Sequence, residues 1–332
     1  MEKYRLAYNK IKEADNILLL THQRPDGDAL SSMCAFTLLL DRLHKNYAAF
    51  CYDRPSAAFH FLPNIEKITT VPPEFGKESG KKQSGKYFSD FDLIIILDCG
   101  SIHRTGLGEE IIRHKDQDQF LLEFDHHPKV EDEGDLEIRK PEAASTTEVL
   151  YYFFQKNNIT IDKDIANCIL TGILTDTANF LHPTTTKNSM NIASKMLLSG
   201  AYFPKITKST WQNKTISSMK LWGIALDNLK INKRYNIAFT VLTLDDIEKY
   251  KENGEAFDSI AGFLSNIGGE LKAVLFLREE EKGKIKGSLR AIDPTMDVSK
   301  LANYFGGGGH AKASGFMIEG SIEKTEKGWK II

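Results

Sequence analysis

The stretch FDLIIILDCGS, residues 91–101, decides the fold. Its five central residues, 93–97, are all large and apolar, which indicates a strand buried on both faces. Such strands are typical of parallel sheets that helices cover on each side. Further buried strands are predicted at residues 17–20 and 120–124, and helical patterns alternate with the strands as far as residue 185. The sequence therefore predicts an α/β fold with a doubly wound, mostly parallel sheet.

The pattern of predicted strands and helices changes after Gly200. A strand is predicted at 236–243, a hairpin at 270–280 and 284–291, a helix at 298–305 and a last strand at 314–320. We therefore expect a first domain at 1–190, a linker at 191–215 and a smaller α+β domain at 216–332. Two domains suit a chain of 332 residues.

The composition, 41% hydrophobic and 27% charged, is that of a globular protein. No apolar run reaches the roughly 20 residues that span a bilayer, and the polar N-terminus has no signal-peptide core. The four cysteines are scattered, which favours reduced thiols and a cytoplasmic location. A formal net charge of −2 argues against long duplex nucleic acid and favours a small anionic ligand. A homodimer is left open.

Polar side chains follow each of the three predicted core strands. They are His22, Asp26 and Asp28 after the first, Asp98 after the second, and Asp125, His126 and His127 in the third. Asp176 interrupts an apolar helix. Taken singly, each aspartate is more often a turn or capping residue. Turn residues would occur at either end of the strands, however, and these all follow the carboxyl ends, where open α/β sheets bind ligands.

So many carboxylates in one crevice repel one another unless cations offset their charge. Carboxylate and imidazole ligands without thiolate suit Mn²⁺ or Mg²⁺, and admit Fe²⁺, Co²⁺ or Zn²⁺. The number of acids suggests two metal ions with one bridging carboxylate, which is the arrangement for metal-assisted phosphoester hydrolysis.

Four segments, HQRPDGD, LDCGS, DHHP and TGILTDT, resemble the motifs of the DHH phosphoesterases in order and spacing. In the second half, GSLRA and FGGGGHAKASGF resemble the DHHA1 substrate domain. Length and domain pairing are most similar to the nanoRNase/pAp phosphatase group (bifunctional oligoribonucleases, NrnA-like). The resemblance implies a cleft between the two domains, cleavage of short oligonucleotides and removal of phosphate from 3′-phosphoadenosine 5′-phosphate (pAp), with Mn²⁺ as the metal.

The resemblance also implies roles for individual residues. One metal would be held by His22, Asp26 and Asp98, and the other by Asp28, Asp98, His126 and Asp176. His127 would face the scissile phosphate or its leaving group, and Asp125 would orient an imidazole, so His127, Asp98 and Asp125 are the predicted catalytic residues. The predicted substrate-binding residues are Arg104, Arg290, Gly307, Gly308, Gly309 and His310.

The chain departs from the family pattern after Asp176. The family's TDTG-x-F-R segment reads TDTANFLH here, so Leu181 stands where an arginine is common, and His182 is its candidate substitute. This departure affects substrate preference, and a phosphodiesterase for linear pApA or cyclic dinucleotides remains an alternative. An inactive scaffold is a second alternative, although such proteins lose metal-binding acids and this chain keeps them.

Overall fold

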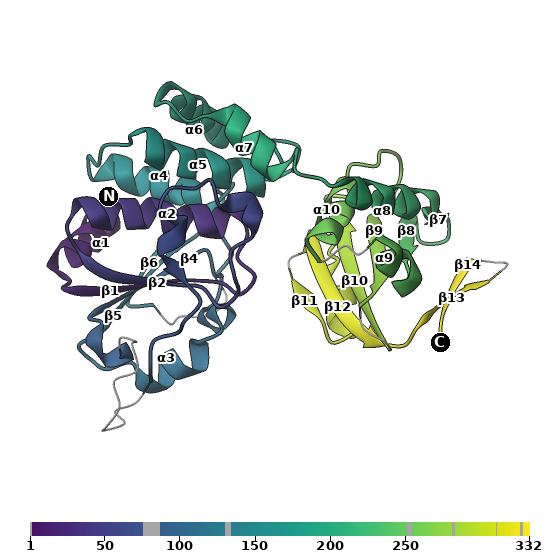
Figure 1. Cartoon of the computed structure of the whole chain (residues 1–332), viewed down its shortest axis with the longest axis horizontal. Helices are drawn as coiled ribbons and strands as arrows, with labels where there is room; N and C mark the ends of the chain where they lie inside the picture. The colour runs from purple at the N-terminus through teal and green to yellow at the C-terminus, as the bar shows by residue number, and fades with distance from the viewer. Residues whose placement is uncertain are drawn as a thin grey trace. The chain divides into compact units, whose positions relative to one another are not determined.

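The computed structural model describes residues 2–75, 87–129, 134–250, 254–280, 283–309, 311–325 and 328–332. The chain divides into two compact units, Met1–Asn213 and Lys214–Ile332 (Figure 1). Each unit has its own sheet and its own hydrophobic core.

The first unit is built on a six-stranded sheet in the order β3-β2-β1-β4-β5-β6. Each of its described pairings is parallel. The strands are β1 (Asn16–Thr21), β2 (Asn46–Phe50), β3 (Ile68–Thr69), β4 (Leu93–Leu97), β5 (Phe120–Asp125) and β6 (Leu136–Arg139). The prediction of a doubly wound parallel sheet is therefore confirmed.

Helices cover both faces of this sheet, with α3 on the face opposite α2, α4 and α5 (Figure 1). The helices are α1 (Glu2–Glu13), α2 (Gly27–Arg42), α3 (Gly108–His114), α4 (Thr146–Lys156), α5 (Lys163–Asp176), α6 (Lys187–Leu198) and α7 (Phe203–Thr210). Short 3-10 turns are η1 (Ala57–Phe59), η2 (Ile65–Lys67), η3 (Phe88–Asp90) and η4 (Ile102–Thr105).

Strand β4 shows why the sheet needs two covering layers. Leu93, Ile95 and Leu97 point into the core shared with α2, α4 and α5. Ile94 and Ile96 point into the second core, beside α3. Because successive side chains of a strand face opposite sides, an uninterrupted apolar run must be buried on both.

The second unit has a mixed six-stranded sheet in the order β11-β12-β10-β9-β8-β7, in which β8 and β9 are parallel. Its strands are β7 (Lys230–Asn232), β8 (Ile237–Leu242), β9 (Ala273–Glu279), β10 (Lys284–Ala291), β11 (Gly308–Gly309) and β12 (Ala313–Glu319). Its helices are α8 (Ile216–Asp227), α9 (Leu244–Tyr250), α10 (Gly254–Leu264) and α11 (Ser299–Tyr304). The predicted hairpin is confirmed, since β9 and β10 pair antiparallel.

Two segments differ from the sequence prediction. Residues 191–215, expected as a linker, contain the second half of α6 and all of α7. Ile192 and Met196 of α6 and Ile206 of α7 are buried in the first core. The strand expected to be last is β12, and a two-stranded ribbon, β13 (Ile322–Thr325) with β14 (Gly328–Ile331), follows it.

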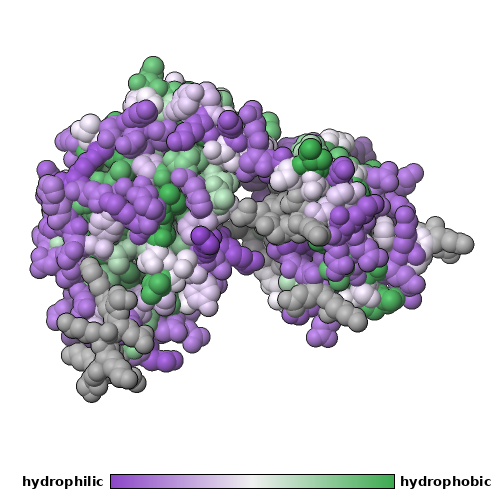
Figure 2. All heavy atoms as spheres, viewed as in Figure 1, coloured by the Kyte–Doolittle hydropathy of each residue, from purple (hydrophilic) through white to green (hydrophobic). Residues whose placement is uncertain are grey.

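The visible surface of the described residues is mostly hydrophilic, with smaller apolar areas between (Figure 2). No helix in the described ranges has the length and apolar character needed to cross a bilayer. All four cysteines are buried and unpaired, as expected for reduced thiols.

Candidate metal centre

The predicted site lies where the strand order of the first sheet reverses. Strands β1 and β4 are neighbours, while the chain continues outward from β1 to β2 on one side and from β4 to β5 on the other. This is the switch point at which open α/β sheets bind ligands. His22 follows β1, Asp98 follows β4, and Asp125 ends β5, so all three are at the same edge. Asp98 has φ +60°, a left-handed conformation directly after the strand.

One possible ligand set is His22, Asp26 and Asp98, whose ligand atoms lie within 4.8 Å of one another. His22 Nε2 lies 3.8 Å from Asp26 Oδ2 and 3.9 Å from Asp98 Oδ2. The other ring nitrogen, Nδ1, lies 2.7 Å from the carbonyl oxygen of Gln23. A proton on Nδ1 would be donated to that carbonyl, and Nε2 would then be available to a metal.

A second set is Asp28, His126 and Asp176. His126 Nε2 lies 3.2 Å from Asp176 Oδ2 and 3.5 Å from Asp98 Oδ1, so Asp98 lies beside both sets. Asp28 accepts hydrogen bonds from the backbone N–H groups of Thr146 and Thr147 and from the Thr147 hydroxyl. These donors form the N-terminus of α4, where the helix dipole also favours a negative charge.

A third set, Asp98, His126 and His127, places His127 at the edge of the same cluster. Its Nδ1 lies 2.7 Å from Asp125 Oδ1 and 3.6 Å from Asp98 Oδ1. The Asp125 carboxylate also faces Arg139 Nη1 at 3.2 Å. Burial alone would raise the pKa of Asp125, but hydrogen bonds from His127 and the charge of Arg139 outweigh it and hold that pKa below its usual value.

Burial and mutual repulsion shift the other acids in the opposite direction. Burial, followed by the charge of Asp26, raises the pKa of Asp28 to about 7. Burial and then the charges of Asp28 and Asp26 raise the pKa values of Asp98 and Asp176 well above the ordinary range. Burial also lowers the pKa of His126 to about 4. Divalent cations would offset this repulsion and hold the carboxylates ionised and the imidazole neutral, so the donor set fits a metal centre.

The structure thus brings together all eight predicted residues of the first unit that carry carboxylate or imidazole groups. Arg104 lies beside them, since its Nη1 donates to the carbonyl oxygen of Cys99 at 2.9 Å. His182 Nδ1 lies 3.0 Å from the Thr184 hydroxyl. Leu181 is exposed.

The predicted substrate residues of the second unit lie close together within it. Arg290 on β10 pairs with Ala313 of β12, and Gly309 of β11 pairs with the next residue, Ser314. Gly308 and Gly309 of the glycine run are therefore part of the sheet. A side chain at Gly307 would approach Phe316 Cα to 2.6 Å, so only glycine fits there. His310 lies outside the described residues.

The sequence did not identify the residues that hold the predicted ligands in place by hydrogen bonds and ion pairs. Arg139, at the end of β6, has a side chain that is only 8% exposed, and it pairs with Glu123 at 2.7 Å as well as with Asp125. The Thr146 hydroxyl donates to Asp98 Oδ1 at 2.8 Å. The N-cap of α4 is the neighbouring residue Ser145, whose side chain accepts from the Glu148 N–H. Nothing in the local pattern shows that the same helix end also holds two acids more than 40 residues away.

The segment after Asp176 carries backbone strain. Ala178, Asn179 and Phe180 all have positive φ, between +48° and +66°. Ala178 stands where the family motif has glycine, the residue that adopts this conformation without a steric penalty. The Thr177 hydroxyl accepts from the Phe180 N–H at 3.1 Å, which holds the turn next to Asp176.

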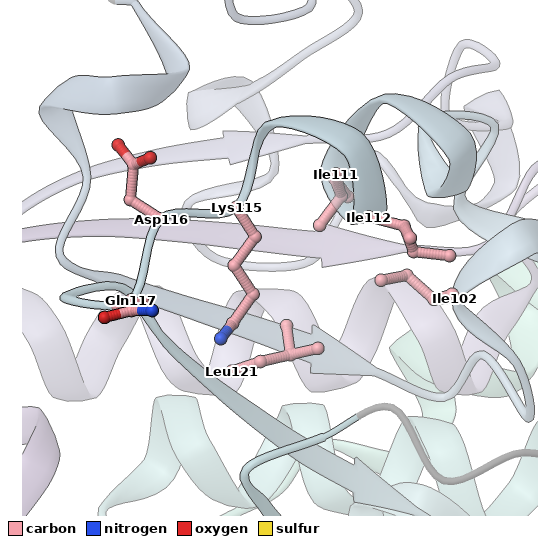
Figure 3. Close-up of a pocket in the computed structure, with 7 residues that line it drawn as sticks. All are labelled: Ile102, Ile111, Ile112, Lys115, Asp116, Gln117 and Leu121. Carbon is pink, nitrogen blue, oxygen red and sulfur yellow. The ribbon is translucent and has the colours of Figure 1, made fainter.

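A separate hollow of about 330 Å³ lies on the α3 face of the sheet (Figure 3). Its lining is mainly apolar, with Ile102 beside Ile112 and Lys115 beside Leu121. Lys115 pairs with Asp135 at 3.1 Å. None of the acids of the candidate metal centre lines this hollow, so we assign it no part in the chemistry.

Residues 16–173 match the DHH family N-terminal domain, and residues 234–329 match the DHHA1 domain. The chain therefore belongs to the DHH family of phosphoesterases with a DHHA1 domain, and it is a hydrolase. Among named relatives it is similar to the bifunctional oligoribonuclease and PAP phosphatase NrnA of Bacillus subtilis (strain 168), with 24% identity over 92% of this chain and 90% of the relative. A probable manganese-dependent inorganic pyrophosphatase of Enterococcus faecalis is 23% identical over 72% of this chain and 68% of its own length.

A crystal structure of an exopolyphosphatase-related protein from Bacteroides fragilis has the same fold. Its TM-score is 0.82, with 24% identity, and the match covers 95% of this chain and 90% of that one.

Proposed function

We propose that this protein is a two-metal phosphoesterase that hydrolyses short oligoribonucleotides to mononucleotides and dephosphorylates pAp. The observation that carries the proposal is the position of Asp98, whose two carboxylate oxygens face different ligand sets. A carboxylate so placed is suited to bridge two divalent ions.

His22, Asp26 and Asp98 would hold one ion, and Asp28, Asp98, His126 and Asp176 the other. Oxygen and imidazole donors suit Mn²⁺, with Mg²⁺, Co²⁺ or Fe²⁺ as alternatives. The similarity to a probable manganese-dependent pyrophosphatase supports Mn²⁺. When bound, a pair of such ions neutralises phosphate charge and lowers the pKa of an attacking water.

His127 is proposed as the catalytic residue that faces the phosphate or its leaving group. Asp125 accepts from Nδ1, which fixes the ring and leaves Nε2 for the substrate. A proton on Nε2 could then pass to the departing oxygen, and the Asp125 carboxylate would stabilise the charged ring beforehand. Arg139 in turn holds Asp125 ionised.

The preference for short substrates is supported by charge and by the NrnA relative. A net charge of −2 provides no field for long polyanions, so the anion must be bound by local groups. Arg104 in the first unit and Arg290 with Gly307, Gly308 and Gly309 in the second are the proposed phosphate-binding groups, together with His310. Participation of both domains in one substrate, a cytoplasmic location and a dimeric state remain predictions.

The test compares wild-type protein with Asp98→Ala on dinucleotides, pAp, linear pApA, cyclic di-AMP and polyphosphate, each with Mn²⁺, Mg²⁺ or Co²⁺. We expect dinucleotide and pAp hydrolysis to depend on metal and to be abolished by Asp98→Ala. Asp118→Asn, a change at an exposed acid away from the cluster, is the matched control.

Two results would contradict the proposal. Full activity of Asp98→Ala would exclude the metal mechanism, and purified wild-type protein that neither binds metal nor hydrolyses any phosphoester would favour a scaffold. Selective turnover of pApA or cyclic di-AMP would keep the mechanism and change the substrate.

A further inference from the structure

Tyr52 lies just beyond the carboxyl end of β2, beside the edge that carries the metal cluster. Its side chain is 52% exposed although it lies against Gly106. A Cβ atom at position 106 would lie 2.6 Å from Tyr52 Cδ2 and 2.7 Å from Gln23 Nε2. Gly106 also has φ +78°. Position 106 thus requires glycine, and its lack of a side chain lets the tyrosine ring lie there with much of its surface in solvent.

Backbone contacts connect this ring to the metal cluster. Gly106 follows η4, whose residue Arg104 accepts from the Gln23 N–H at 2.6 Å. Gln23 is the neighbour of His22, and Arg104 Nη1 donates to Cys99, the neighbour of Asp98. The tyrosine therefore adjoins segments that position one predicted ligand, His22, directly after β1 and another, Asp98, directly after β4.

Three arginines belong to the chain segments next to the ring, together with the acids Asp26 and Asp53. Arg24, Arg54 and Arg104 are all exposed, and within the described part of the chain none of the three forms an ion pair. Asp53 is the acid next to them in sequence, and its carboxylate accepts from the Arg24 backbone N–H at 2.7 Å. Exposed guanidinium groups of this kind are suited to bind phosphate oxygens.

From this arrangement we propose that Tyr52 stacks on a nucleobase of the substrate while Arg24 and Arg54 bind its backbone phosphate. An aromatic face flanked by cations is how proteins hold single-stranded nucleic acid without reading its sequence. Our inference rests on the proposed function, which supplies a nucleotide substrate. It adds that the first domain itself binds the base, and that a single-stranded end with a base is preferred to a bare phosphoester.

The test measures KM and kcat of Tyr52→Ala, Tyr52→Leu and Tyr52→Phe with a dinucleotide and with its abasic analogue. Loss of one stacked base corresponds to about 5- to 150-fold in affinity. We expect KM for the dinucleotide to rise by that factor in the Ala and Leu variants, with kcat little changed, and Phe to behave as wild type. With the abasic analogue, all four proteins should have the same KM.

Tyr202→Ala is the matched control, because Tyr202 is similarly exposed (57%) and lies at the start of α7. It should leave both constants unchanged. If wild type hydrolyses dinucleotides and Tyr52→Ala has an unchanged KM, the stacking role is excluded and the proposed function stands. If wild type hydrolyses no nucleotide substrate, the proposed function fails and the stacking role fails with it.

Discussion

Gly172 is the position where one added methyl group tests the architecture of the metal centre. It lies in α5, and a Cβ atom there would overlap Asp28 Oδ1 and Thr147 Oγ1, while Thr147 Cγ2 would lie at 2.5 Å. Gly172→Ala must therefore push α5 away from Asp28 and from the N-terminus of α4. The substitution removes no predicted ligand, so its effect reports only on how Asp28 is positioned.

The expected magnitude follows from two opposing effects. Overpacking a buried contact costs about 1–3 kcal/mol, and alanine is better than glycine in a helix by about 1 kcal/mol. The net loss of stability is thus up to about 2 kcal/mol, or a fall in melting temperature of up to about 8 °C for a unit of this size. Displacing the supports of a ligand should also weaken metal binding by about 10- to 100-fold.

Calorimetric unfolding of the full chain measures the loss of stability, and titration with Mn²⁺ measures the loss of metal affinity. Gly223→Ala in α8 is the control, because its Cβ would meet no atom within 4 Å. It should stabilise the protein by up to about 1 kcal/mol and leave metal affinity unchanged. A Gly172→Ala protein with wild-type Mn²⁺ affinity and an undiminished melting temperature would refute the reasoning.

Three further predictions concern the supports and charges of the site. Ala178→Gly should raise the free energy of unfolding by up to about 1 kcal/mol because φ at 178 is +48°, whereas Ala178→Val should lower it. Denaturant titration measures both changes. Equal stability of the wild type and the two variants would count against backbone strain at this position. Arg139→Met should cost about 3–5 kcal/mol in the same assay, since Glu123 and Asp125 would lose their buried partner; a loss below about 1 kcal/mol would contradict this. In EDTA-treated protein the melting temperature should fall as the pH rises above about 6.5, because Asp28, with a pKa of about 7, and Asp98 and Asp176, with pKa values well above the usual range, favour the folded state only while they are protonated. His22 and His126 have lowered pKa values in the folded protein, so they do not oppose this fall. Mn²⁺ should remove the dependence, and a flat profile without metal would oppose it.

The sequence was sufficient to place the main strands of the first sheet. Residues 93–97 have no polar side chain, and only a strand buried on both faces accommodates that pattern. The same reasoning placed the acids after β1, β4 and β5 at one edge, because parallel strands share the direction of their carboxyl ends. Whether these residues bind metal is still a prediction that the Asp98→Ala experiment tests.

The sequence was less informative where a segment has little periodicity of its own. Helix α7 lies in the segment 191–215 that was expected as a linker. Phe203–Thr210 is mostly polar, and the helix buries Ile206 alone against the first core. The ribbon β13–β14 was missed for a similar reason, since its exposed residues show no buried face.

The sequence alone determined which residue types stand at the strand ends, and hence that a cluster of acids and imidazoles forms at one edge. Tertiary structure alone decided how each is held. Asp28 is bound by Thr146 and Thr147, 118 and 119 residues away, and Asp125 is held between His127 and Arg139. Local patterns encode the period of a strand or the cap of a helix. The partner of a buried charge depends on which distant helix end or strand end packs against it, and that is fixed only when the layers come together.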